Sequence, residues 1–381
     1  MKPVTLQQPK RIVLGDGCAS QAAEFIASRG WRRAAVVTSP PVLPAAKAFL
    51  DATARAGLAV DVHDGVDREP TVAMFQAALA RARKARPEVV VGIGGGSALD
   101  VAKLAAALLD SDQPVAEVFG SGKLAGRNTP LVCLPTTSGT GSEVSPNALL
   151  LDEADGRKKA VVSPHIVPDA AYVDPVLTVT VPPAVTAATG MDAFIHCIEA
   201  YANVNAHPAV DLYALEGVRL IAANLARAVA RGDDLPARSA MSLGSLYGGL
   251  CLGPVSTAAV HALSYPLSEM FHVAHGLANA VLLAEVMAFN IAAAPKRYAQ
   301  IAVAMGVGAG RNDAEAAAAA VAGVRDLTRR IGVAKPLREL GIPADAIARM
   351  AEAAMKVTRL LVNNLRPLTQ ADVESIYKKA Y

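Results

Sequence analysis

Short apolar runs alternate with helical segments along the first half of the chain, and this alternation is typical of a parallel α/β sheet. The runs are rich in β-branched residues and almost continuously apolar, as expected for buried strands. The Ala-rich stretches between and after them have the length of helices. The predicted strands are residues 34–37, 89–93, 130–134 and 171–173, and the predicted helices cover about 44–56 and 72–85.

The pattern changes after the two prolines at 182 and 183. From about residue 184 the chain consists of long apolar-periodic segments, rich in Ala and Leu and interrupted by Gly and Pro. This texture predicts an all-helical second domain. We therefore expect an α/β domain at residues 1–180 and a helical domain at residues 181–381.

Two stretches of the second half have unusual compositions. Residues 314–322 are almost all alanine, but Asp313 in front of them as an N-cap and two arginines behind them predict an ordinary helix. Residues 276–294 are the most apolar stretch and still contain Asn279, Glu285 and Asn290. We expect a buried helix there and not a membrane span.

Composition and charge narrow the function classes. The chain has 381 residues, which is long for one core, and its 37 Lys+Arg nearly balance its 34 Asp+Glu. No basic run with interleaved aromatic residues suggests nucleic acid, so a small molecule is the expected partner. The first residues lack an apolar secretory segment, and the four cysteines lack Cys-x-x-Cys spacing. Both observations favour a cytoplasmic protein with reduced thiols and no membrane association.

Four potential metal ligands lie in apolar, helix-forming sequence of the second half. Asp192 and His196 are four residues apart, so one helix would present both on the same face. His261 and His275 could add two further imidazoles, a ligand set that suits iron or zinc. The alternative is that each is a core residue with its own hydrogen bonds. An unpartnered buried charge is costly, which favours the metal site.

A glycine-rich turn follows the predicted strand 89–93 and opens a helix. Without a Cβ, the glycines at 94–96 let backbone N–H groups approach a pyrophosphate, and the helix N-terminus favours the anion. The glycines are consecutive, which is not the usual dinucleotide fingerprint. A tight turn without a ligand remains the alternative.

A second loop, residues 135–143, follows the next strand and is rich in hydroxyl side chains. Open α/β sheets bind ligands at the carboxyl ends of their strands, so both loops are expected to face one ligand. The alternative is that these Ser and Thr residues only cap and shape the turn.

Taken together, these motifs resemble the iron-containing (group III) alcohol dehydrogenases over most of the chain. That resemblance implies a Rossmann-like dinucleotide-binding domain followed by an all-α domain, an architecture like that of the dehydroquinate synthases. It also implies a metal in the cleft between the domains. The motifs are Gly94-Gly95-Gly96-Ser97 with Asp100 and Lys103, Pro135-Thr136-Thr137 with Gly139-Thr140 and Ser142-Glu143, Gly190-Met191-Asp192 with His196, then His261, and His275-Gly276 with Ala278-Asn279-Ala280.

The resemblance also assigns roles to individual residues. It places the glycine turn and Ser97 at the cofactor diphosphate, the threonines of the second loop beside the nicotinamide, and Lys158 near the ribose. Asp192, His196, His261 and His275 match the metal ligands one for one. The implied cofactors are NAD or NADP and one divalent metal, with Fe(II) as the first choice and Zn(II) as the alternative, and the implied assembly is a homodimer. The cofactor-site residues are Gly94, Gly95, Gly96, Ser97, Asp100, Thr136, Thr137, Thr140, Ser142, Lys158 and Ser39.

This chain departs from the family pattern at two places. Many members carry a further histidine four residues after the first C-terminal ligand, where this chain has Tyr265. His272, three residues before His275 and on nearly the same helical face, is the alternative for the proton path, so both are candidate catalytic residues. After the strand that ends at Val37, where NAD-preferring members place an acidic residue, this chain has Thr38-Ser39-Pro40, and without that carboxylate the enzyme need not reject NADP.

The implied reaction is reversible hydride transfer between an alcohol, held as a metal-bound alkoxide, and the nicotinamide. The same architecture leaves other possibilities open. One is a metal-independent reductase that resembles the maleylacetate reductases, and another is a lyase that resembles the dehydroquinate synthases. A third, from a different class, is a dinucleotide-binding regulatory protein without turnover.

Overall fold

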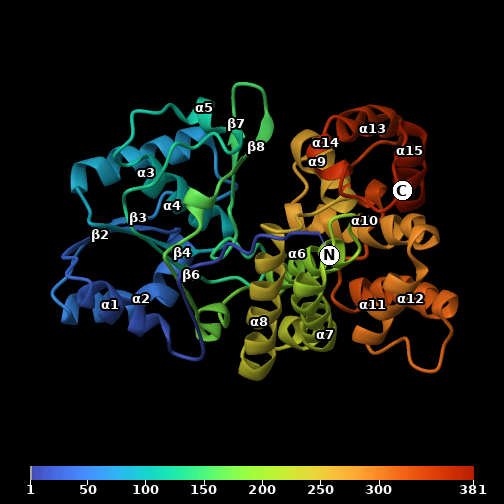
Figure 1. The fold of residues 1–381 in the computed structure, drawn as a ribbon, viewed down its shortest axis with the longest axis horizontal. Helices are drawn as coiled ribbons and strands as arrows, with labels where there is room; N and C mark the ends of the chain where they lie inside the picture. The colour runs from blue at the N-terminus through green and yellow to red at the C-terminus, as the bar shows by residue number, and fades with distance from the viewer. Residues whose placement is uncertain (1) are drawn as a thin grey trace. The chain divides into compact units, whose positions relative to one another are not determined.

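The computed structural model describes residues 2–381, and these residues form two compact units. The α/β unit is Leu6–Val181, and the helical unit is Pro182–Tyr381 together with the N-terminal residues up to Thr5. Each unit is described by itself below and can be followed by its element labels in Figure 1.

A six-stranded sheet forms the centre of the α/β unit, and every neighbouring pair of its strands is parallel. The strand order is β1-β9-β6-β4-β2-β3. All four predicted strands are present, whereas β1 and β3, which lie at the two edges and are less apolar, were not predicted. The bounds are Arg11–Leu14 (β1), Arg33–Val37 (β2), Ala59–His63 (β3), Val89–Gly94 (β4), Leu131–Pro135 (β6) and Ala170–Val173 (β9).

Helices cover both faces of this sheet (Figure 1). Val90 packs in one buried cluster with residues of α3 and α4, and its neighbours Val89 and Val91 pack in a second cluster with residues of α1 and α2. Successive side chains of a strand point to opposite faces, so both faces need apolar residues and the central strands are continuously apolar. The helices are Ala19–Ser28 (α1), Leu43–Arg55 (α2), Val72–Ala85 (α3) and Gly96–Leu108 (α4).

A small second sheet was not predicted. Its order is β5-β8-β7, with β7 and β8 antiparallel, and β7 packs against α4. β5 has only two residues and β8 begins with three basic residues, so the apolar run at residues 148–151 of β7 has no apolar partner strand to mark a sheet in the sequence. The elements are Val115–Val118 (α5), Gly120–Ser121 (β5), Asn147–Asp152 (β7) and Arg157–Val162 (β8).

The helical unit contains α-helices and short 3-10 turns from Pro183 onward, which confirms the all-helical prediction for this half. Close approach of the helices needs small residues. A Cβ on Gly276 would lie 2.2 Å from the carbonyl oxygen of Ala188, so α10 begins directly against α6. The helices are Pro183–Tyr201 (α6), Pro208–Ala230 (α7), Leu235–Leu252 (α8), Ala259–Phe271 (α9), His275–Asn290 (α10), Pro295–Ala304 (α11), Asp313–Arg330 (α12), Ile347–Met355 (α13), Thr358–Leu361 (α14) and Gln370–Ala380 (α15).

The two stretches of unusual composition are both helical. The N-cap of α12 is Asn312, whose side chain accepts from the backbone of Glu315 in a capping box, and Asp313 is the first helical residue. The prediction of Asp313 as the cap was therefore wrong by one position. His275–Ala293 is long and apolar enough to cross a membrane, but half of its apolar window is buried within the structure. It is a core helix, as predicted.

Candidate active site

Asp192 and His196 lie on one face of α6, as their spacing predicts. Both are buried, and His196 Nε2 is 3.9 Å from Asp192 Oδ1. The segment of α6 from Gly190 to Tyr201 is buried all round because α7, α8 and α10 pack against it. A carboxylate in such a place needs compensating partners.

Two further imidazoles reach the same carboxylate oxygen. His261, on α9, has its Nε2 3.4 Å from Asp192 Oδ1, and His275, the first residue of α10, has its Nε2 3.6 Å from it. Ligands held at roughly 2.1 Å from one Zn²⁺ or Fe²⁺ lie about 3.0–3.5 Å from one another, so these separations fit a shared ion.

The four predicted ligands are not equally close. Ligand atoms of Asp192, His261 and His275 all lie within 4.8 Å of one another, and His196 does not belong to this group. The ring of His196 instead stacks on that of His261, with 4.9 Å between centroids and 14° between planes. The structure thus brings three predicted ligands tightly together and places the fourth directly beside them.

The ionisation of these groups favours a bound cation. Burial by itself would raise the pKa of Asp192, but His196, His275 and His261 together lower it well below its usual range. Burial would lower the pKa of His261, but the neighbouring carboxylates of Asp192 and Glu199 raise it to about 9. The carboxylate therefore stays ionised, and positive charge is favoured around it.

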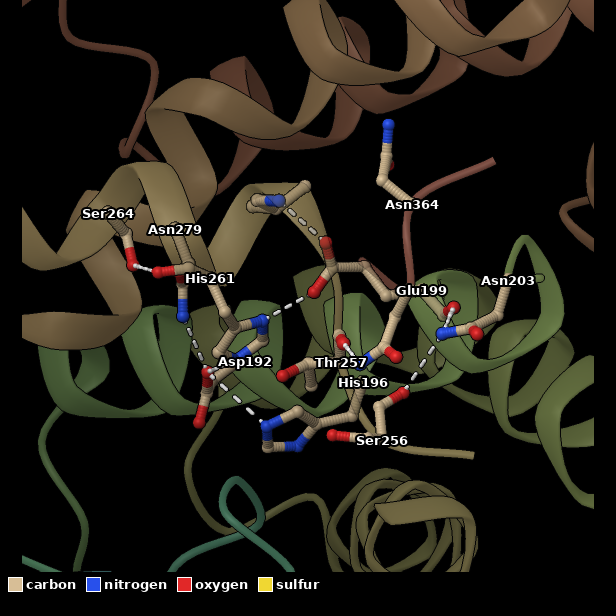
Figure 2. A network of polar contacts seen from close by, with 12 residues as sticks. Asp192, His196, Glu199, Asn203, Ser256, Thr257, His261, Ser264, Asn279 and Asn364 are labelled. Carbon is tan, nitrogen blue, oxygen red and sulfur yellow. Dashed lines mark hydrogen bonds and ion pairs between the residues drawn. The ribbon is translucent and has the colours of Figure 1, made fainter. Parts of the chain in front are cut away.

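Glu199 is a residue of the candidate site that the sequence analysis did not name. Its Oε2 is 2.6 Å from His261 Nδ1, and its Oε1 accepts from the backbone N–H of Val260 at 2.6 Å (Figure 2). This contact keeps a proton on Nδ1, so a bound metal would take the place of the second proton, on Nε2. Nε2 is buried and makes no hydrogen bond within the described residues. The i+7 spacing from Asp192 is a signal that would have found Glu199.

Asn279 was quoted only as part of a motif, and the structure gives it a contact in the site. Its Nδ2 donates to Asp192 Oδ1 at 2.9 Å (Figure 2) and lies 3.2 Å from His275 Nε2. Asn279 is four residues after His275 on α10, so helical spacing again explains the approach. The amide fixes the orientation of the carboxylate.

The two candidates for the proton path lie in different environments. Tyr265 is buried on α9, its ring centroid is 6.2 Å from that of His275, and burial raises its pKa. His272 is exposed and ends α9 in the left-handed region, with φ 55°. α9 therefore ends before α10 begins, and the expectation that His272 and His275 share a helical face was wrong.

In the α/β unit, the two predicted loops lie against each other. The backbone N–H of Thr136 donates to the carbonyl of Gly94 at 2.9 Å, at the carboxyl ends of β4 and β6. A Cβ on Gly96 would lie 2.5 Å from the Thr140 methyl carbon, and one on Gly95 would lie 3.3 Å from Thr137 Oγ1. The glycines are thus required where α4 begins against the threonine loop.

The other predicted cofactor residues are spread over the α/β unit. Asp100 and Ser142 are buried and hydrogen-bond to each other at 2.5 Å, one helical turn below the glycines. Lys158, on β8, forms an ion pair with Glu69. Ser39 is partly buried directly after β2 and precedes a 3-10 turn, Pro40–Val42.

Comparison with known proteins decides the family. Residues 9–175 match the family described as iron-containing alcohol dehydrogenase, and residues 186–381 match the C-terminal domain of the same family. The chain belongs to the iron-containing alcohol dehydrogenases. Its fold class, with an α/β domain that carries the parallel sheet and an all-helical C-terminal domain, is that of the family, and its function is that of a metal-dependent alcohol dehydrogenase.

Individual relatives agree over nearly the whole chain. A long-chain-alcohol dehydrogenase of Geobacillus thermodenitrificans is 41% identical over 85% of this chain and 83% of its own length. A 1,3-propanediol dehydrogenase of Klebsiella pneumoniae is 33% identical over 96% of each. Among solved structures, a 1,3-propanediol oxidoreductase matches with a TM-score of 0.96 at 32% identity over all of both chains. A sulfoacetaldehyde reductase of Bifidobacterium kashiwanohense in complex with NAD⁺ matches with 0.90 at 31%, over 100% of this chain and 99% of its own.

Proposed function

We propose that this enzyme transfers hydride between an alcohol, or the matching aldehyde or ketone, and NAD or NADP, with one divalent ion held by Asp192, His196, His261 and His275. The observation that carries the proposal is the convergence of imidazole Nε2 atoms on one ionised, buried carboxylate. In the proposed domains, residues 1–180 bind the dinucleotide and residues 181–381 bind the metal and substrate.

When bound, the metal supplies Lewis acidity toward the substrate oxygen. The chain's own residues prepare its place. Glu199 orients His261, and Asn279 orients Asp192, so neither ligand has to reorganise on binding. One carboxylate and three imidazoles accept both iron and zinc. Fe(II) is the proposed ion because of the family, with Zn(II) as the alternative.

The dinucleotide is assigned to the two loops of the α/β unit. The backbone N–H groups at Gly94–Ser97 and the N-terminus of α4 suit the diphosphate, and Thr136, Thr137 and Thr140 suit the nicotinamide side. Ser39 offers no carboxylate to repel a 2′-phosphate, so both NAD and NADP are proposed as cofactors. Lys158 is proposed to lie near the ribose. Asp100 and Ser142, which hydrogen-bond to each other one helical turn after the glycines, are proposed to support the two loops.

The substrate is proposed to be a small alcohol or carbonyl compound. The relatives named above act on long-chain alcohols, 1,3-propanediol and sulfoacetaldehyde, so the family accommodates chemically different substrates. We further propose that the enzyme is a homodimer in the cytoplasm, without a nucleic-acid or membrane partner.

The test is an assay of chelated protein with a panel of alcohols and with both dinucleotides. Ferrous iron or zinc is then added without oxygen, and nicotinamide absorbance is followed. We expect turnover only after metal addition, and the same assay identifies the preferred metal and dinucleotide. Turnover that is indifferent to metal would contradict the proposal, as would a wild-type protein that binds neither NADH nor NADPH.

A further inference from the structure

Lys103 is completely buried in the α/β unit, on α4. Lysine is rarely found in such a place without partners, because removing an ammonium from water is costly. Burial lowers its pKa, while the nearby Asp100 carboxylate acts in the opposite direction. The contacts of its Nζ therefore decide which form is present.

Those contacts require the charged form. Nζ donates to the backbone carbonyl oxygens of Ser142 and Ser145, at 2.8 Å each, and to that of Asn147. A carbonyl oxygen can only accept, so three such partners use three N–H groups, which only the ammonium has. Three carbonyls around one positive atom resemble the way in which backbone oxygens hold a metal cation.

The carbonyls belong to the end of the threonine loop and the start of β7. Asp100 strengthens the same connection, because its carboxylate is hydrogen-bonded to Ser142 Oγ at 2.5 Å and to the Leu149 backbone N–H at 2.9 Å. Asp100 and Lys103 lie on one face of α4, below Gly96, which touches Thr140. The first two turns of α4 are thus fastened to residues 140–149 along their length.

We propose that the Lys103 ammonium is a positioning residue that acts as an internal cation and holds the threonine loop against the glycine turn in the geometry that binds the dinucleotide. This inference rests on the proposed function, because it takes these two loops to be the dinucleotide site. Lys103 itself does not touch the cofactor. It sets the distance between the glycine turn and the threonine loop, which bind the cofactor.

The test measures the dissociation constant for NADH by nicotinamide fluorescence, first for the wild type and then for Lys103→Ala. Lys84→Met, which changes an exposed lysine of α3, is the matched control. We expect Lys103→Ala to bind NADH at least about tenfold more weakly, because the two loops would then have to be ordered when the dinucleotide binds, and we expect the control to match the wild type. Metal content of the helical unit should not change. Added methylammonium should occupy the vacated position and restore part of the affinity.

Every other outcome of this experiment also supports or overturns the inference. A folded Lys103→Ala protein whose NADH affinity stays within twofold of wild type overturns the inference, as does a loss that methylammonium leaves unchanged. If Lys103→Ala does not fold, Lys103→Gln, which keeps much of the side-chain volume and two N–H donors, replaces it, and weakened NADH binding by that folded variant supports the inference. A Lys103→Gln protein that binds NADH normally, or that also fails to fold, overturns it. Wild-type protein that binds no dinucleotide overturns the proposed function itself.

Discussion

The two candidate sites solve the problem of a buried cation in opposite ways. In the helical unit, histidine side chains converge on Asp192 Oδ1, and we propose that a bound ion supplies the positive charge there. In the α/β unit, backbone carbonyls converge on Lys103 Nζ, and the chain supplies the cation itself. The proposed metal site thus consists of titratable side chains, whereas the proposed positioning site consists of one ammonium and backbone oxygens.

The pKa values of two buried carboxyl groups, one in each unit, are shifted in opposite directions. The surrounding histidines lower the pKa of Asp192 despite its burial. Burial raises the pKa of Glu143, beside Lys103, to about 7. The carboxylate of the candidate metal site therefore stays ionised, whereas the Glu143 carboxyl is protonated below about pH 7.

The largest effect is expected when the charge of the Asp192 side chain is removed without a change in its size. We expect Asp192→Asn to lose bound metal and to lower turnover by at least about a thousandfold, because the metal contributes several kcal/mol to transition-state stabilisation. NADH binding should persist, since the dinucleotide loops lie in the other unit. Metal analysis and steady-state kinetics check this, with the exposed Asp326→Ala as control. A variant that keeps both metal and turnover would contradict the assigned site.

The second prediction concerns Glu143 and the stability of the α/β unit. Its pKa is raised above the unfolded value of about 4.5, so the unfolded chain ionises first as pH rises. The contribution of Glu143 to the free energy of unfolding is thus fully present below about pH 4.5. It decreases by roughly 3 kcal/mol as the pH rises to about 7. Glu143→Gln cannot ionise and should lack this loss. Unfolding by denaturant at pH 5 and pH 8 checks it, and a wild-type-minus-variant difference that does not change with pH would refute it.

A smaller effect is expected at Glu199, which touches the metal site only through His261. Glu199→Gln still offers an oxygen to His261 Nδ1 but loses its charge, so we expect metal affinity to fall about 10- to 100-fold. Competition with a chelator of known affinity measures this directly. The control is Glu352→Gln, on the exposed surface of α13. Equal metal affinities in all three proteins would mean that Glu199 does not tune the ligand.

The same comparison explains what the sequence could predict. Asp192 and His196 could be predicted as neighbours because they lie on one helix, where spacing alone determines which side chains share a face. The same rule would have found Glu199, seven residues after Asp192 on α6, and Asn279, four residues after His275 on α10. The role of Lys103 has no local signal, because its partners are carbonyl oxygens some 40 residues later in the chain.

Helix ends show a similar limit. The four central strands were predicted because burial on both faces leaves a continuous apolar run. α9, however, continues through Pro266, where a local rule would place a break, and ends at His272 without a Gly or Pro. Packing around Pro266 and the left-handed backbone of His272 are set by the tertiary structure. The mistaken placement of His272 on the face of His275 follows from this.

The smallest predicted effects separate the two candidates for the proton path, Tyr265 and His272. Tyr265→Phe removes a buried hydroxyl beside His275, and we expect kcat to fall by less than about tenfold, since a phenol with a raised pKa is a weak acid–base catalyst near neutral pH. His272→Asn keeps a residue that tolerates the left-handed backbone, so any loss reports on the imidazole and not on strain. Because His272 is exposed, kcat should stay within about twofold of wild type, as for a surface substitution. The measurement is kcat across pH 6–9 for both variants with metal content matched. A large loss in His272→Asn that follows an imidazole-like titration would assign the proton path to the exposed end of α9 instead.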